Sequence, residues 1–129
     1  MSMMNILVVD DKQAVLSQLD NLLSPLGHRV VMANNGLDGY EKVQKEVFDL
    51  IIVDHLMPLM NGIQMLKNIK QHIENVPPIF FMTTQGKDNA ADLIEHSLCD
   101  TVLDKPLDET HLLSLISQLN KQNTHARYL

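Results

Sequence analysis

The sequence predicts an α/β fold, a doubly wound sheet of five parallel strands in the order 2-1-3-4-5 with five helices on its two faces. Short apolar runs alternate five times with stretches whose apolar residues recur at helical spacing. The first, third and fourth runs are apolar throughout, as strands covered on both faces are. These three are therefore expected in the centre of the sheet, and the second and fifth at its edges.

The first half of the chain is expected to hold two strands and two helices. Residues 5–10 (NILVVD) form a strand-like run that ends in acid, and Asp11 is placed to cap the helix that follows. That helix is expected to stop at Gly27. Residues 28–33 read as a shorter, more polar strand, and a second helix follows the turn at 34–36. Its apolar face is predicted to comprise Leu37, Tyr40, Val43 and Val47.

The second half is organised around residues 50–53 (LIIV), an unbroken apolar run that ends at Asp54. A third helix follows and ends before the two prolines at 77–78. Residues 79–82 form the fourth strand, and residues 101–103 form a short last strand. The fourth helix, which lies between them, is expected to carry Ala90, Ala91 and Ile94. The apolar residues of the fifth helix are Leu112, Leu113, Leu115, Ile116 and Leu119.

Composition favours one globular domain. The chain has 129 residues, 45% hydrophobic and 20% charged, which predicts a core over about 5–120 and a frayed polar tail at 121–129. A net charge of −6 argues against binding nucleic acid through a broad basic surface. No apolar run approaches the roughly 18 residues of a membrane span, and no basic leader is present. Cys99 is alone, which excludes an internal disulfide, so a reduced, cytoplasmic protein is expected.

Five polar residues follow or end the predicted strands: Asp10, Asp11, Asp54, Thr83 and Lys105. The carboxyl ends of parallel strands meet at one edge of a sheet, where ligands bind. Three carboxylates there repel one another unless a cation is present, and an all-oxygen ligand set suits Mg²⁺ better than Zn²⁺. A lysine and a hydroxyl beside them fit phosphoryl transfer onto a carboxylate. Taken singly, each residue could merely cap a helix or hold a loop, but the five together favour a site.

From Ile6 to about Leu119 the chain resembles the receiver domain of two-component response regulators, the CheY-like superfamily with a flavodoxin-like fold. The matching residues are the following: Asp10-Asp11 after the first strand, Asp54 followed by Met57-Pro58 and Asn61-Gly62, then Thr83, then Lys105-Pro106. D-x-x-M-P alone is a modest motif. The ordered set is specific to this family.

The resemblance implies that Asp54 accepts a phosphoryl group from a phosphohistidine of a histidine kinase or histidine phosphotransfer protein. Asp11, Asp54 and the backbone carbonyl of Leu56 would ligate Mg²⁺, with Asp10 acting mostly through water. Lys105 would pair with the phosphoryl oxygens. Such a domain is no enzyme in the usual sense, because it only assists its own phosphorylation and dephosphorylation.

The resemblance also implies a switch. Thr83 would move toward the phosphate and change the surface formed by the fourth helix, the fifth strand and the fifth helix. That surface would bind a downstream protein or a fused output domain, or support a phosphorylation-dependent dimer; no nucleic-acid or membrane contact is expected. The Lys105–Pro106 peptide bond is often cis in this family.

Three positions depart from the family pattern and affect the output step. The family has Tyr or Phe three residues before the lysine, as a switch coupled to the threonine, and this chain has Val102. Thr84 stands where Ala or Gly is usual and narrows access to the phosphoryl group. Leu98 stands where a glycine commonly ends the fourth helix, so this helix end should be built differently.

Three further residues lie near these positions in the sequence. Leu56 and Gln85 occupy the positions that tune dephosphorylation in this family, although Gln85 reads equally well as a solvated loop residue. His55, next to Asp54, is interpreted as a plain loop residue rather than a base or a metal ligand, because no second histidine has paired metal spacing with it.

Other functions fit the sequence less well. A receiver that docks without phosphorylation is the main alternative. An aspartate-nucleophile phosphatase of the haloacid-dehalogenase type needs a D-x-D arrangement and a longer chain, and Asp10-Asp11-Lys12 does not supply it. A flavodoxin-like cofactor binder needs a Ser/Thr/Gly-rich phosphate loop where this chain has DDKQAV. The sequence leaves open a single-domain receiver or a part of a larger regulator or hybrid kinase.

Overall fold

The computed structural model describes residues 3–127, except for the side chains of Lys87 and residues 121–127. One parallel sheet has the strand order β2-β1-β3-β4-β5, as the sequence predicts. Its strands are β1 (Asn5–Val9), β2 (Arg29–Ala33), β3 (Leu50–Asp54), β4 (Ile79–Thr83) and β5 (Thr101–Asp104). The helices are α1 (Gln13–Leu23), α2 (Gly36–Lys45), α3 (Gly62–His72), α4 (Ala91–Glu95) and α5 (Glu109–Arg127). Two 3₁₀ turns, η1 (Ser24–Leu26) and η2 (Lys87–Ala90), follow α1 and precede α4.

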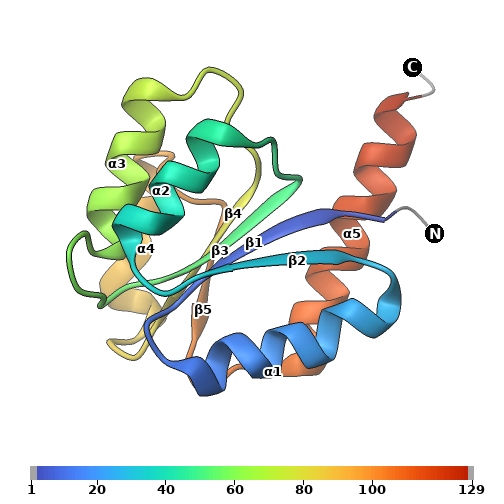
Figure 1. Cartoon of the computed structure of the whole chain (residues 1–129), viewed down its shortest axis with the longest axis horizontal. Helices are drawn as coiled ribbons and strands as arrows, with labels where there is room; N and C mark the ends of the chain where they lie inside the picture. Colours follow the sequence, from blue (N-terminus) through green and yellow to red (C-terminus); the bar gives the residue numbers. More distant parts are fainter. Residues whose placement is uncertain (1–2, 128–129) are drawn as a thin grey trace.

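Two layers of helices cover the sheet (Figure 1). Helices α1 and α5 pack on one face, and α2, α3 and α4 pack on the other. Alternate residues of β3 face the two layers, because side chains point to opposite faces along a strand. Ile51 and Val53 join the core under α2 to α4, whereas Leu50 and Ile52 join the core against α1 and α5. All five residues of β3 are buried, which explains its unbroken apolar sequence.

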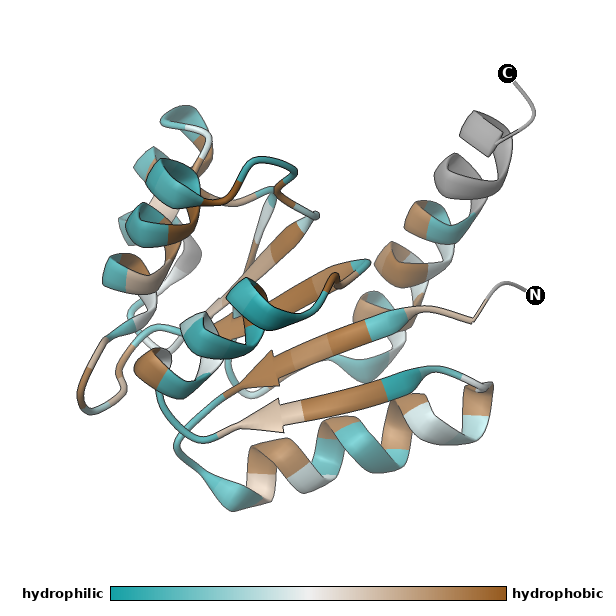
Figure 2. Cartoon of the chain, turned by 45° about the horizontal axis from the view of Figure 1, so that its top comes forward, coloured by the Kyte–Doolittle hydropathy of each residue, from teal (hydrophilic) through white to brown (hydrophobic). Residues whose placement is uncertain are grey.

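Hydropathy follows this layering. Figure 2 shows hydrophobic strands between helices whose outer sides are hydrophilic. In the described part of the chain, no helix is both long enough and apolar enough to cross a membrane.

The start of α1 differs from the prediction that Asp11 caps it. The N-cap residue is Lys12, and no side-chain hydrogen bond caps the helix there. Asp10 Oδ1 accepts a hydrogen bond from the Lys12 N–H at 2.9 Å, which leaves Asp11 to the acidic cluster described below. Gly27 is left-handed, with φ +95°, and ends the 3₁₀ turn after α1, so the chain stops its helical course where the sequence indicated.

The apolar face predicted for α2 is half wrong. Val43 is buried and Tyr40 packs against the core, but Leu37 is exposed and Val47, which lies beyond the helix end at Lys45, is 86% exposed. Gly36 and Gly39 are buried in their place, so glycines form part of the helix face that packs on the rest of the protein. A Cβ atom at Gly39 would lie 2.9 Å from a methyl group of Val9, so this helix lies too close to β1 for larger side chains.

Helix α5 extends beyond the expected core. It runs to Arg127, so the backbone of the polar segment from Asn120 is helical over the described residues. Residues 128–129 of the predicted tail lie outside the described residues.

Helix α4 is short and ends in a Schellman motif. The Leu98 N–H donates to the Leu93 carbonyl at 2.8 Å, and the Ser97 N–H donates to the Ile94 carbonyl at 3.0 Å. Ser97 is left-handed, with φ +59°. Ile94, which was expected among the apolar residues of this helix, is exposed, and Leu93 is buried instead. The helix end is therefore built around a serine one residue before Leu98.

We expect Ser97→Gly to stabilise the fold. A left-handed residue with a Cβ atom is strained and glycine is not, so the free energy of unfolding should rise by about 1 kcal/mol. Urea denaturation measures this change. Ser97→Ala is the control: it also removes the hydroxyl but keeps the Cβ atom, so it should bring no gain. An equal gain in both variants would contradict the explanation from backbone strain.

Candidate functional site

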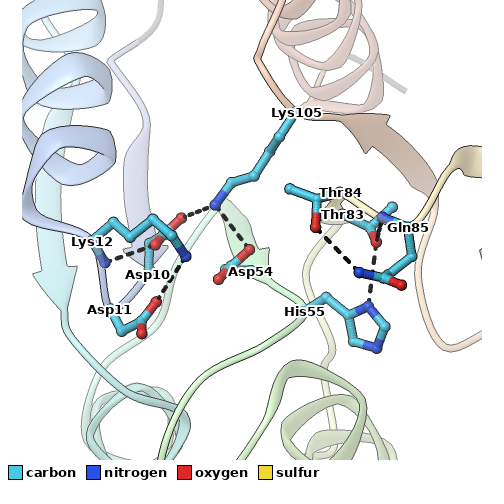
Figure 3. Close-up of polar contacts among 9 residues, drawn as sticks. All are labelled: Asp10, Asp11, Lys12, Asp54, His55, Thr83, Thr84, Gln85 and Lys105. Carbon is cyan, nitrogen blue, oxygen red and sulfur yellow. Dashed lines mark hydrogen bonds and ion pairs between the residues drawn. The ribbon is translucent and has the colours of Figure 1, made fainter.

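Three carboxylates gather at the carboxyl ends of β1 and β3 (Figure 3). The two strands are neighbours, with Val9 paired to Val53, so the residues that follow lie side by side. One oxygen from each of Asp10, Asp11 and Asp54 lies within 4.8 Å of the others. Asp10 is fully buried and Asp54 is 3% exposed, whereas Asp11 lies at the exposed rim.

Lys105 supplies the opposite charge. It follows β5, and its Nζ donates to Asp10 Oδ2 at 2.7 Å and pairs with Asp54 Oδ1 at 2.9 Å. Burial alone would lower the pKa of Lys105, but the two carboxylates outweigh it and raise the pKa overall. The lysine is therefore held in its charged form. The Lys105–Pro106 peptide bond is cis, as the resemblance implied.

Asp54 has unused bonding capacity. Burial raises the pKa of Asp54, its hydrogen bond from Lys105 opposes this, and the charge of Asp10 raises it further. Asp54 Oδ2 is buried and has no hydrogen-bond partner among the described residues. Three carboxylates with one lysine and an unpartnered oxygen fit a hard divalent cation such as Mg²⁺. Leu56, the source of the remaining predicted ligand, lies two residues beyond Asp54, with an exposed side chain.

The loop after Asp54 is tied back to the strand. Asn61 and Gln64 form a reciprocal capping box at the start of α3. The Gly62 N–H donates to the His55 carbonyl at 2.8 Å. A Cβ atom at Gly62 would lie 2.2 Å from the Asp54 carbonyl oxygen and 3.0 Å from the ring of Phe81. The N-terminus of α3 therefore sits against the backbone that carries Asp54, and this explains the glycine.

We expect Gly62→Ala to lower the free energy of unfolding by about 3 kcal/mol, because the added methyl group must push the end of β3 aside. Alanine is otherwise the better helix former, so the loss reports the clash. Gly27→Ala is the control, since space is open around its Cβ position and only its φ of +95° opposes alanine. That variant should lose about 1 kcal/mol in urea denaturation. Equal losses would contradict the close approach.

Thr83, the last residue of β4, is fully buried on the other side of Asp54 (Figure 3). Its Oγ1 accepts a hydrogen bond from the Gln85 N–H at 3.0 Å and lies 3.2 Å from His55 Nδ1. The His55 ring packs on Phe81, with 5.2 Å between centroids. His55 lies in the loop after β3, as expected, but its ring also contacts Thr83 and Phe81, which the sequence did not predict. The residues are 28 positions apart, and only the fact that His55 follows Asp54 hinted at the contact.

Three other residues expected to affect the site differ in their exposure. Thr84 and Gln85 are exposed, and Gln85 Nε2 donates to Thr84 Oγ1 at 3.4 Å. Val102 is buried in the core under α2 to α4. The structure thus places oxygens of Asp10, Asp11 and Asp54 within 4.8 Å of one another and pairs Lys105 with Asp10 and Asp54. It leaves the Thr83 hydroxyl bonded to a separate group.

Comparisons with known proteins agree with this geometry. The family profile described as "Response regulator receiver domain" matches residues 6–117. The chain is 38% identical over 114 residues to the transcriptional regulatory protein ZraR of Klebsiella oxytoca, an alignment that covers 88% of this chain and 26% of that protein. It is 33% identical over 116 residues to the protein PilH of Pseudomonas aeruginosa, covering 89% of this chain and 96% of PilH.

Solved structures share the fold. The receiver domain protein (CheY-like) from Methanospirillum hungatei matches with a TM-score of 0.82 at 26% identity, over 96% of this chain and 99% of that one. The chain therefore spans about a quarter of ZraR but nearly all of PilH and of the solved domain.

Proposed function

The chain belongs to the response regulator receiver family, and on that premise we propose that it accepts a phosphoryl group on Asp54. The observation that carries the proposal is the position of Asp54: it is buried, pairs with Lys105 at 2.9 Å and lies beside two more carboxylates, and its Oδ2 has no partner in the part of the chain that the structure describes. The donor is a phosphohistidine of a histidine kinase or a histidine phosphotransfer protein. The chain acts as one cytoplasmic receiver domain and not as a free-standing enzyme.

In the transfer, an oxygen of Asp54 forms a bond to phosphorus while the phosphorus–nitrogen bond of the phosphohistidine breaks. The electron pair of the broken bond stays on the imidazole, which takes a proton from water. Lys105 lies where its ammonium can follow the negative charge from the carboxylate to the phosphoryl oxygens. The ammonium of Lys105, 2.9 Å from Asp54 Oδ1, favours the ionised carboxylate, which attacks without a base to activate it.

Asp11, Asp54 and the Leu56 carbonyl would hold Mg²⁺, with Asp10 acting through water. When bound, Mg²⁺ supplies positive charge that reduces the repulsion between the phosphoryl oxygens and the three carboxylates. Asp10 already has two partners of its own, since it accepts hydrogen bonds from the Lys12 N–H and from Lys105. It is therefore suited to a supporting role, and Asp54, with its free oxygen, to the acceptor role.

The phosphorylated chain would signal by a change of surface. Thr83 leaves its present partners for the phosphoryl group, and the region of α4, β5 and α5 responds. The partner is a downstream protein, an output domain on the same polypeptide or a second phosphorylated copy. The relatives differ in length, since the match spans about a quarter of ZraR and nearly all of PilH.

Intact-mass measurement after incubation with acetyl phosphate and Mg²⁺ tests the proposal. We expect a gain of one phosphoryl group, removed by hydroxylamine and absent when a chelator replaces Mg²⁺. If acetyl phosphate gives no label, a phosphorylated histidine phosphotransfer domain is the second donor. Failure with both donors would overturn the proposal and leave a receiver that docks without phosphorylation.

A further inference from the structure

The Thr83 hydroxyl is held by two groups that belong to neither the acidic cluster nor Lys105. Oγ1 accepts a hydrogen bond from the Gln85 N–H at 3.0 Å and shares a second with His55 Nδ1 at 3.2 Å. Thr83 is fully buried, so water cannot replace either partner cheaply. Any movement of the hydroxyl toward a phosphoryl group on Asp54 must first break the bond to His55 (Figure 3).

The position of His55 is fixed by its own backbone and ring. Its N–H donates to the Met82 carbonyl at 3.0 Å, which extends the pairing of β3 with β4 by one residue. Its carbonyl accepts from the Gly62 N–H at 2.8 Å, which joins it to the start of α3. The ring lies 5.2 Å from the Phe81 ring at 50°. The contact with Thr83 is therefore built into the sheet and is not a chance meeting of flexible side chains.

His55 also lines an open space. A pocket of about 320 Å³ lies between α3 and α4, lined by His55 together with Lys67 from α3, Asp92 from α4 and His96, which follows α4. A ring that loses its bond to Thr83 has room to move into this pocket. Val102, which is aliphatic and buried, offers no ring or polar atom that could follow Thr83 in the same way.

We propose that His55 is a positioning residue that holds Thr83 in the unphosphorylated arrangement. When the bond between His55 and Thr83 breaks, the His55 ring moves toward the pocket between α3 and α4. This rests on the proposed function, because it concerns the switch that phosphorylation of Asp54 drives. The bond stabilises only the unphosphorylated arrangement. His55 therefore sets how much of the chain switches at a given level of phosphorylation.

The test uses beryllofluoride, a stable mimic of the phosphoryl group, titrated in the presence of Mg²⁺. The Thr83 methyl signal and the backbone signals of Lys67 and His96 are followed by NMR. His55→Phe keeps the ring that packs on Phe81 but removes the nitrogen. We expect its titration midpoint to fall about 5-fold, the factor for one hydrogen bond of typical net strength. Its unligated Thr83 methyl signal should also move toward the position that the bound native chain shows.

His55→Asn is the rescue variant, because its amide places a polar atom near the position of Nδ1. We expect its midpoint and its unligated Thr83 signal to lie near those of the native chain. In a Thr83→Val background, His55→Phe should not change the midpoint, because the bond is already absent. A structural effect of the ring alone would give the same change in both backgrounds.

Three outcomes would overturn the proposal: no change of midpoint in His55→Phe, an equal change in the Thr83→Val background, or no rescue by asparagine. If the native chain binds no beryllofluoride, the proposed function fails instead. The Thr83 methyl signal of the chain without beryllofluoride then tests the positioning role of His55 independently. A shift in His55→Phe that asparagine reverses supports the positioning role, and the absence of a shift overturns it.

Discussion

Asp54→Asn is expected to abolish phosphoryl labelling by acetyl phosphate altogether. An amide has no ionised oxygen to attack phosphorus, and the other two carboxylates are not equivalent substitutes. Asp10 is buried with both oxygens hydrogen bonded, and Asp11 lies at the exposed rim, where Lys12 approaches it at 3.4 Å. Intact-mass measurement of the native chain and the variant, under the same conditions, gives the result directly.

The loss of labelling in Asp54→Asn could also result from loss of folding, so the stability of this variant is measured as well. Burial raises the pKa of Asp54 above its value in the unfolded chain, so at neutral pH the ionised carboxyl group makes folding less favourable. The neutral asparagine should therefore raise the urea midpoint in the absence of metal. Asp49→Asn is the matched control: Asp49 lies at the opposite end of β3, where its carboxylate accepts from the Asn5 N–H. Undiminished labelling of Asp54→Asn, or equal loss in Asp49→Asn, would contradict the assignment.

Lys105→Met is expected to slow labelling by about 10²- to 10³-fold, the usual effect of removing one group that stabilises developing charge. The same change leaves Asp10 and Asp54 buried beside each other without a cation. Breaking a buried ion pair from one side costs about 3 kcal/mol, so the free energy of unfolding should fall by that amount. Added Mg²⁺ should restore more stability to this variant than to the native chain, because it replaces the missing charge.

Lys12→Met provides the comparison for Lys105→Met. The Lys12 side chain is 60% exposed and pairs with Asp11 at the rim of the same cluster. Exposed ion pairs contribute about 0 to 1 kcal/mol, so both its stability and its labelling rate should stay close to the native values. If the two lysine variants behaved alike, general electrostatics of the rim would explain the effect, and the assigned role of Lys105 would be wrong.

The sheet and the acidic cluster could be predicted because both follow from local sequence. A short run rich in β-branched residues, such as residues 50–53, favours a strand buried on both faces, and the polar residue at its end then lies at the carboxyl edge of the sheet. Once the strands are parallel and in order, Asp10, Asp54 and Lys105 must meet, whatever the loops do. Geometry at this level needs no knowledge of side-chain packing.

The features that the sequence did not predict depend on contacts between distant segments. The contact of His55 with Thr83 joins residues 28 positions apart and depends on how the loop after β3 turns. The buried face of α2 is formed by Gly39 because the helix approaches Val9 closely, and hydropathy patterns do not register a glycine as a core residue. The left-handed residue that ends α4 is Ser97 and not a glycine, so the sequence did not indicate its conformation.

The most direct test of the central claim is borohydride reduction of the phosphorylated chain, followed by mass mapping of its peptides. Borohydride reduces an acyl phosphate to an alcohol and leaves free carboxylates unchanged, so it records which aspartate carried the phosphoryl group. The account predicts homoserine at position 54 and unchanged aspartate at positions 10 and 11. Homoserine at either of those two positions, or a labelled chain that yields none at position 54, would contradict it.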